Sequence, residues 1–128
     1  MLPFKTINEL EEFDKRLADV ETFRQTTMYM KNIGGPNQME HVQKILQKFL
    51  SDEVAFHYNV GGKLLKKTDS RKRKRSFKNT KLFDCIIAGT KAEHTIVENR
   101  LKFKIGKWLA GANLRLILQR KRRAREIL

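Results

Sequence analysis

Apolar residues recur at every third or fourth position through most of this chain, in segments that begin at helix-capping residues. One such segment follows Asn37, and its apolar row is Met39, Val42, Ile45, Leu46, Phe49 and Leu50. An earlier one follows the capping box Thr6-Ile7-Asn8-Glu9, and its apolar row is Leu10, Phe13, Leu17 and Val20. This period is that of amphipathic helices, and no alternating strand pattern or hairpin signal accompanies it. We therefore expect a helical fold.

Helix-breaking and capping residues divide the rest of the chain into further short helices. Asp19 suggests a second cap, Gly34-Gly35-Pro36 stops a helix, and helix resumes near Asn79-Thr80. Thr95-x-x-Glu98 opens the last core helix, whose inward residues are Val97, Leu101, Ile105, Trp108 and Leu109. We predict an all-α, single compact domain of about five short helices, with a long basic loop and a basic C-terminal helical extension. The domain would span residues 1–118, with the loop at 63–78, and residues 119–128 would form a basic tail.

The charge of the chain lies almost entirely in its second half. The formal net charge is +14: residues 1–62 hold 7 Lys/Arg against 9 Asp/Glu, whereas residues 63–128 hold 21 against 5. A near-neutral scaffold joined to a cationic surface favours a polyanionic partner, either nucleic acid or an anionic membrane surface.

Two cationic runs stand out within that half. Residues 63–81 contain 10 Lys/Arg and one acid, and centre on Arg71-Lys72-Arg73-Lys74-Arg75. Such a run is typical of a nuclear-import signal, and it can also neutralise backbone phosphates; a solvated loop is the alternative. A second run, Arg120-Lys121-Arg122-Arg123, strengthens the expectation of a nuclear protein.

The last core helix carries a third basic feature. Arg100, Lys104 and Lys107 have i, i+4, i+7 spacing and form one stripe beside the core face, with Phe103 close to them. An aromatic ring beside cations suits a helix that contacts a DNA groove. The alternative is that Phe103 packs under the C-terminal extension while the cations remain solvated.

Several function classes find no support in the sequence. His41, His57 and His94 share no metal-ligand spacing with one another or with Cys85, and no catalytic residue or small-molecule site is indicated. Cys85 is the single cysteine, which excludes an internal disulfide and suits a reducing compartment. No apolar run reaches the length of a membrane span, and the first residues do not form a secretory signal. We expect neither an enzyme nor a cofactor.

The order of features resembles an animal family called domain of unknown function 4806. The similarity extends over residues 2–116 and rests on an ordered set of segments: Leu2–Thr6, Glu9–Phe13, Ile33–Gly35, Val42–Leu46, Ser51–Ala55, Phe56–Asn59, Lys78–Leu82 and Lys107–Leu109. The family has no settled function to transfer.

The second half of the chain also resembles the BEN domain, a helical module of chromatin proteins. Several BEN domains bind DNA through the last helix and neighbouring loops, and others serve protein association. The resemblance implies DNA contacts from the last helix and the loop, at Arg100, Lys102, Lys104 and Lys107 and at Lys63, Lys66, Lys67, Arg71, Lys72, Arg73, Lys74, Arg75 and Lys78. The basic stretch at 64–75 is longer here than in the BEN pattern.

These patterns lead to one hypothesis and two alternatives. The first is a nuclear DNA-binding or chromatin-associated module that contacts duplex DNA through the basic loop and the last core helix. The second is a protein-interaction module, a homodimer for example, whose basic runs are only import signals. Its association surface would consist of Phe103, Leu114, Ile117 and Leu118. RNA is the third possible ligand, although sparse aromatic residues argue against a base-stacking platform.

Overall fold

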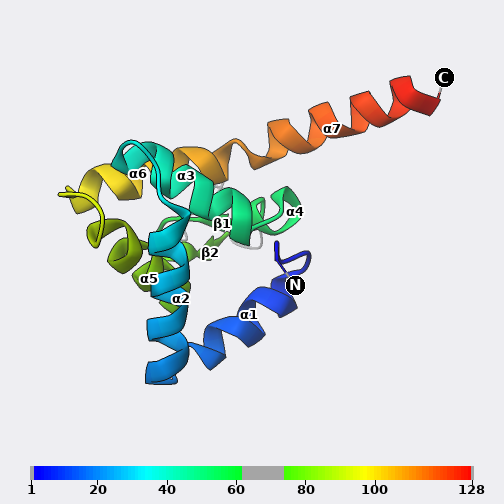
Figure 1. Ribbon diagram of the computed structural model, residues 1–128. Coiled ribbons are helices and arrows are strands. Elements are labelled where there is room, and N and C mark those ends of the chain that lie inside the picture. The colour runs from blue at the N-terminus through cyan, green and yellow to red at the C-terminus, as the bar shows by residue number, and fades with distance from the viewer. Residues whose placement is uncertain (1, 62–73, 128) are drawn as a thin grey trace.

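The computed structural model describes residues 2–61 and 74–127, and its regular structure is almost entirely helical (Figure 1). The helices are α1 (Ile7–Arg16), α2 (Val20–Ile33), α3 (Gln38–Phe49), α4 (Asp52–Ala55), α5 (Lys81–Lys91), α6 (Glu98–Ala110) and α7 (Ala112–Ile127), with a 3-10 turn η2 (Phe77–Asn79). Helices α1 to α6 form the body of the molecule, and α7 extends away from it. The all-α prediction is confirmed.

Most helices begin at the caps that the sequence indicates. The side chains of Thr6, Asp19, Asn37 and Thr80 each accept a hydrogen bond from a backbone amide three residues later. Ser51 does the same for the single turn of α4. At its other end α2 stops at Gly34, whose φ of 64° favours glycine. The capping box of α1 is only half formed, because the Glu9 carboxylate accepts from the Lys5 amide rather than from Thr6.

The hydrophobic core lies where α3 meets α2, α5 and α6. The predicted row of α3 is buried from Val42 to Leu50, while Met39 is half-buried. On α6, Leu101, Ile105, Trp108 and Leu109 are buried as predicted. Cys85 is buried on α5, and this burial raises the pKa of its thiol to about 11. Such a thiol serves as packing rather than as a nucleophile at neutral pH.

Two predicted inward positions are wrong. Val20 is 82 % exposed because the chain turns at Asp19 and a new helix begins, so Val20 leaves the row of α1. Val97 is 52 % exposed because α6 begins only at Glu98, and Val97 contributes its carbonyl to the first turn without a side-chain cap. Thr95 therefore does not cap this helix.

The structure also contains a short parallel strand pair, which the sequence does not predict. Strands β1 (Tyr58–Asn59) and β2 (Arg75–Ser76) lie side by side, and the Arg75 amide donates to the carbonyl of His57 at 2.9 Å. Directly after β2, Phe77 is fully buried and its ring lies edge-on to those of Tyr58 and Phe83. The sequence pattern includes Phe77 in the basic loop at 63–78. The end of that segment instead belongs to the core.

Candidate nucleic-acid interface

Helix α6 presents three of its cations on one stripe beside its core face. Arg100 and Lys107 are exposed and Lys104 is half-buried on this stripe, whereas the half-buried Lys102 lies about 160° around the helix from Lys104, on the other side of the core face. Among the residues that the structure describes, no acidic side chain forms an ion pair with any of these four. We call Arg100, Lys104 and Lys107 the α6 basic face. None of its charges is neutralised by an ion pair within the described part of the molecule.

An aromatic ring lies within the α6 basic face. Phe103 is 65 % exposed, and the Lys107 ammonium lies 5.0 Å from the centre of its ring. This exposure contradicts the alternative in which Phe103 packs beneath the C-terminal extension. A ring held beside a cation offers both an apolar surface and a charge to one ligand.

A groove beside this face adds a residue that the sequence does not indicate. The groove has a volume of about 410 Å³, lies between α3 and α6, and is lined by Glu40, Gln43, Lys44, Gln47 and Lys104. The sequence places Lys44 only on the solvated side of the α3 helix. Its position across from Lys104 follows from the packing of α3 on α6, which residue spacing does not give.

The basic loop is described only at its end. Lys63, Lys66, Lys67, Arg71, Lys72 and Arg73 lie outside the described residues. The Lys74 ammonium lies 5.1 Å from the centre of the Phe56 ring, and burial lowers its pKa. Arg75 pairs with Glu11 at 2.7 Å, and Lys78 is exposed on η2. Lys74 and Arg75 therefore have contacts within the protein.

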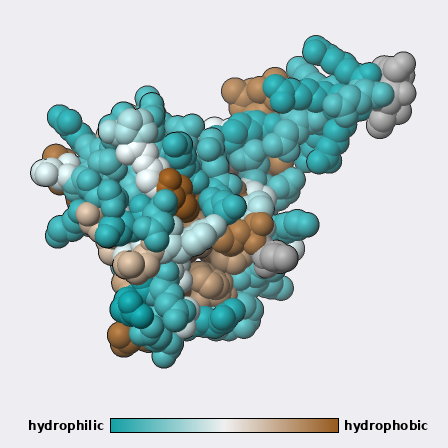
Figure 2. Space-filling model, viewed as in Figure 1, coloured by the Kyte–Doolittle hydropathy of each residue, from teal (hydrophilic) through white to brown (hydrophobic). Residues whose placement is uncertain are grey.

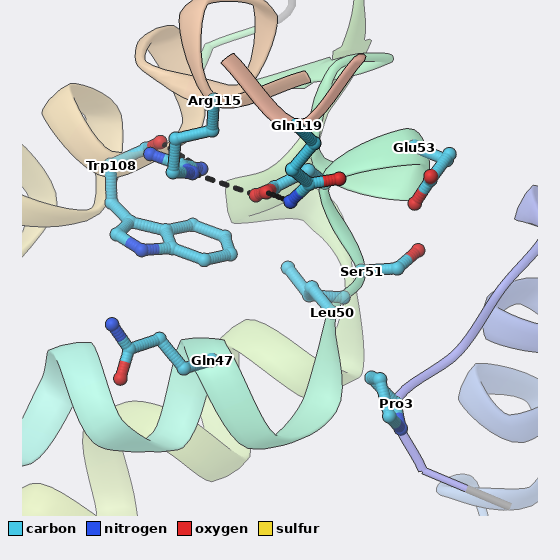
Figure 3. A pocket seen from close by; sticks show the side chains of 9 residues that line it. Pro3, Gln47, Leu50, Ser51, Glu53, Trp108, Arg115 and Gln119 are labelled. Atoms are coloured by element: carbon cyan, nitrogen blue, oxygen red, sulfur yellow. Dashed lines mark hydrogen bonds and ion pairs between the residues drawn. The ribbon is translucent and has the colours of Figure 1, made fainter. Parts of the chain in front are cut away.

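A cluster of contacts fixes the start of α7 to the body. The Nε of Arg115 donates to the Oδ1 of Asp52 at 2.7 Å, and its Nη2 donates to the backbone carbonyl of Trp108 at 2.8 Å. Its guanidinium lies 4.3 Å from the centre of the Trp108 ring. One turn later Gln119 donates to the other oxygen of Asp52 at 3.0 Å. Figure 3 shows these side chains at the edge of a pocket between α3, α4 and α7. We call this cluster the α7 anchor.

The second basic run lies on α7 beyond that anchor. Arg120, Lys121, Arg122 and Arg123 are all exposed. The predicted boundary between residues 118 and 119 falls inside this helix, which continues to Ile127. The run is therefore presented on a helix.

The predicted association residues are all on the surface. Phe103, Leu114, Ile117 and Leu118 have exposed fractions of 65 %, 61 %, 39 % and 48 %. The last three lie near the start of α7, and Figure 2 shows a hydrophobic patch on the part of this helix nearer the body. Phe103 belongs to α6 and is separated from them by the break at Gly111.

Residues 2–61 and 74–127 contain no group of three metal-ligating side chains, and no helix there is both long and apolar enough to cross a bilayer. The rings of His41 and His94 lie with their centres 5.2 Å apart. His41 already bonds the backbone carbonyl of Met30 at 2.8 Å, which gives the ring a structural contact between α3 and α2.

Comparison with known families adds one finding. A family model described as Domain of unknown function (DUF4806) matches residues 1–88. The matched range covers α1 to most of α5, so the α6 basic face and α7 lie beyond it. Comparisons with curated proteins and with solved structures found no match. The family resemblance drawn from the sequence is confirmed over residues 1–88. Its continuation to residue 116 and the BEN resemblance stay predictions.

Proposed function

Because the chain belongs to the family described as Domain of unknown function (DUF4806), whose description names no activity, we propose from its own residues that it is a nuclear module that binds duplex DNA. The observation that carries this proposal is the α6 basic face. Three cations and an exposed aromatic ring lie on one side of a single helix, and no described acid forms an ion pair with them.

A surface of this kind costs free energy in the absence of a partner. Like charges held close together repel one another, and a polyanion relieves that repulsion by replacing its own condensed counterions with the protein's cations. The core face of α6 fixes the direction of the helix, so the backbone positions from which its cations extend are set before a ligand arrives. A preorganised row of this kind suits the regularly spaced phosphates of a duplex.

Duplex DNA fits this surface better than RNA does. Binding to single strands relies on exposed aromatic rings that stack on bases, and the described residues expose few such rings, those of Tyr29, His57 and Phe103. In duplex RNA the major groove is too deep and narrow for side chains to read. The major groove of DNA is wide enough to admit a helix.

The α6 basic face can be tested by removing its charges. We expect the triple variant Arg100→Gln, Lys104→Gln, Lys107→Gln to bind a duplex more weakly. The slope of log affinity against log salt should become shallower by about 0.9 for each phosphate that the variant no longer neutralises. The matched control neutralises Lys5, Lys15 and Arg16, which lie on or next to α1 on the opposite side of the body (Figure 1).

The outcomes separate the alternatives. Equal losses of affinity in the two triple variants would mean that net charge alone drives binding and that α6 is not the interface. Tighter binding to duplex RNA or to single strands would replace DNA with RNA as the ligand. No affinity at low salt for any nucleic acid would overturn the proposal.

Nuclear location is part of the same proposal. The run Arg120–Arg123 is accessible on α7, and the run at 71–75 lies mostly outside the described residues. Fused to a reporter protein, the chain should accumulate in the nucleus, and replacing both runs with Gln should abolish the accumulation. A fusion that stays in the cytoplasm with both runs intact would contradict the nuclear assignment.

A second candidate function is self-association. It is favoured by the exposed side chains of Leu114, Ile117 and Leu118, because an apolar cluster in water usually marks an interface. Repulsion between two +14 chains opposes dimers at low salt. Sedimentation at rising salt decides between them: a tight dimer at low salt, abolished by Ile117→Asp, would favour an association module.

A further inference from the structure

Beyond the α7 anchor the helix carries a run of cations. From Arg120 to Glu126 every side chain is exposed, and Figure 1 shows this part of α7 leaving the body of the molecule. We call residues 120–127 the α7 arm. Its charged residues are Arg120, Lys121, Arg122, Arg123, Arg125 and Glu126. At a rise of 1.5 Å per residue the arm is about 12 Å long.

The cations of the arm surround the helix. Successive residues of an α-helix are rotated by about 100°, so the run from Arg120 to Arg123 places charge on every side. Like charges also fall three or four residues apart, as in Arg120 with Arg123 and Lys121 with Arg125, and such pairs destabilise a helix. Packing is the main source of helix stability in proteins, and it offsets little of this repulsion because the side chains from Arg120 to Glu126 are exposed, with Arg122 at the edge of a hollow that Asp52 also lines. The arm is therefore a helix that a polyanion would stabilise.

The all-round distribution indicates the shape of that polyanion. A membrane surface or the acidic face of a protein would contact one side of the helix, and a membrane would also require an apolar side. The major groove of duplex DNA has a phosphate row on each wall. It is about 12 Å wide, and a helix with its side chains is about 10–12 Å in diameter.

We propose that the α7 arm inserts into the major groove of duplex DNA and that the α7 anchor directs it there. The inference rests on the proposed function, that the chain binds duplex DNA, and adds a second contact element outside the α6 basic face. Arg115 and Gln119 are positioning residues in this arrangement. They hold two successive turns of α7 on the same Asp52 carboxylate, whose side chain is only 13 % exposed.

The arm can be separated from α6 by two variants with the same charge change. One is Arg120→Gln, Arg123→Gln, Arg125→Gln, and the other is the α6 triple variant defined above. The probe is a GC-containing duplex, on which protection of guanine N7 from methylation reports occupation of the major groove. We expect the arm variant to lose a set of protected guanines that the α6 variant retains. The slope of its log affinity against log salt should also become shallower by up to about 2.7, which is about 0.9 for each of three phosphates no longer neutralised.

The α7 anchor is tested by a substitution whose change in net charge would by itself raise the affinity for DNA. Asp52→Ala removes the acceptor of Arg115 and Gln119 and raises the net charge by one, which by itself would strengthen binding to phosphates. We expect weaker binding instead, and loss of the arm-specific protection, because the arm is no longer directed. Gln119→Met changes no charge and keeps a good helix former. It tests the same contact should the Asp52 variant fold poorly.

The results distinguish the proposal that the α7 arm enters the major groove from the proposal that the α6 basic face binds DNA. Binding in which the arm variant keeps the N7 protection and the salt slope would overturn the inference and leave the α6 interface standing. Binding that depends on the arm and not on α6 would overturn the α6 interface and support the arm as the DNA contact. An affinity that rises in Asp52→Ala and is unchanged in Gln119→Met would show that the arm needs no positioning. No binding of the wild-type chain would reject both proposals.

Discussion

At the scale of single residues, the main feature is how differently similar side chains are used. Phe77 follows the most basic stretch of the sequence and is fully buried, whereas Phe103 lies within a well-formed helix and is 65 % exposed. Arg115 and Arg120 lie on the same helix, yet the first is tied to Asp52 and Trp108 and the second is in solvent. Residue type alone does not separate these roles.

The pair of phenylalanines gives a direct test of this difference. Phe77→Ala removes a ring that contacts Tyr58 and Phe83, and should lower the free energy of unfolding by about 3–5 kcal/mol. Phe103→Ala makes the same chemical change at the surface and should alter that free energy by less than about 0.5 kcal/mol. Urea unfolding measures both. Equal effects would mean that the segment after β2 is not part of the core.

At the scale of elements, the body is held together by contacts that helices make with the ends and faces of other helices. The Asp14 carboxylate of α1 accepts hydrogen bonds from the Leu82 amide at 2.8 Å and the Lys81 amide at 3.3 Å, and so caps α5 together with Thr80.

Helices α2 and α5 approach closely at Gly89, where a β-carbon would lie 2.9 Å from the Cβ of Met30.

This close approach predicts an unusual response to alanine. In an isolated helix Gly→Ala is stabilising by about 1 kcal/mol. At Gly89 the added methyl would meet a side-chain carbon and the backbone of α2, so we expect a net loss of about 1–3 kcal/mol, measured by thermal unfolding.

The matched control is Gly106→Ala on α6, where the methyl would lie 3.3 Å from a Val60 methyl carbon. That contact involves one side chain, which can move by a few tenths of an ångström. We expect a neutral or stabilising effect at this position. A Gly89→Ala variant as stable as Gly106→Ala would show that α2 and α5 are not packed this closely.

At the scale of the whole molecule, charge and stability are separated in space. The buried side chains lie in the body and at Ala112 in the first turn of α7, and the side chains from Arg120 to Glu126 are all exposed. As a consequence, the outer turns of α7 can be substituted or removed without unfolding the body.

This separation predicts the effect of truncation. A chain that ends at Gln119 keeps the α7 anchor and should unfold within about 0.5 kcal/mol of the full chain. Arg115→Met in the full chain should cost about 1–3 kcal/mol, because it leaves the mostly buried Asp52 carboxylate without its charged partner. Denaturant unfolding compares the two. A truncation more damaging than Arg115→Met would mean that the outer turns of α7 pack on the body.

The sequence by itself determined the local features of this protein. The helix starts at Thr6, Asp19, Asn37 and Thr80, the stop at Gly34 and the buried row of α3 all follow from interactions within one or two turns, which residue spacing encodes. The separation of charge between the two halves, and the basic stripe of α6, are likewise visible without coordinates.

Only the tertiary structure decided which distant groups meet. Asp14 lies 68 residues from Leu82, Glu11 lies 64 from Arg75, and Asp52 lies 63 from Arg115. In the sequence Asp14, Glu11 and Asp52 look like ordinary solvated acids. No local pattern shows that each of them has a partner more than sixty residues away. The path of the chain around the core brings these groups together, and in doing so it gives α5 its second cap, ties β2 to α1 and gives α7 its direction.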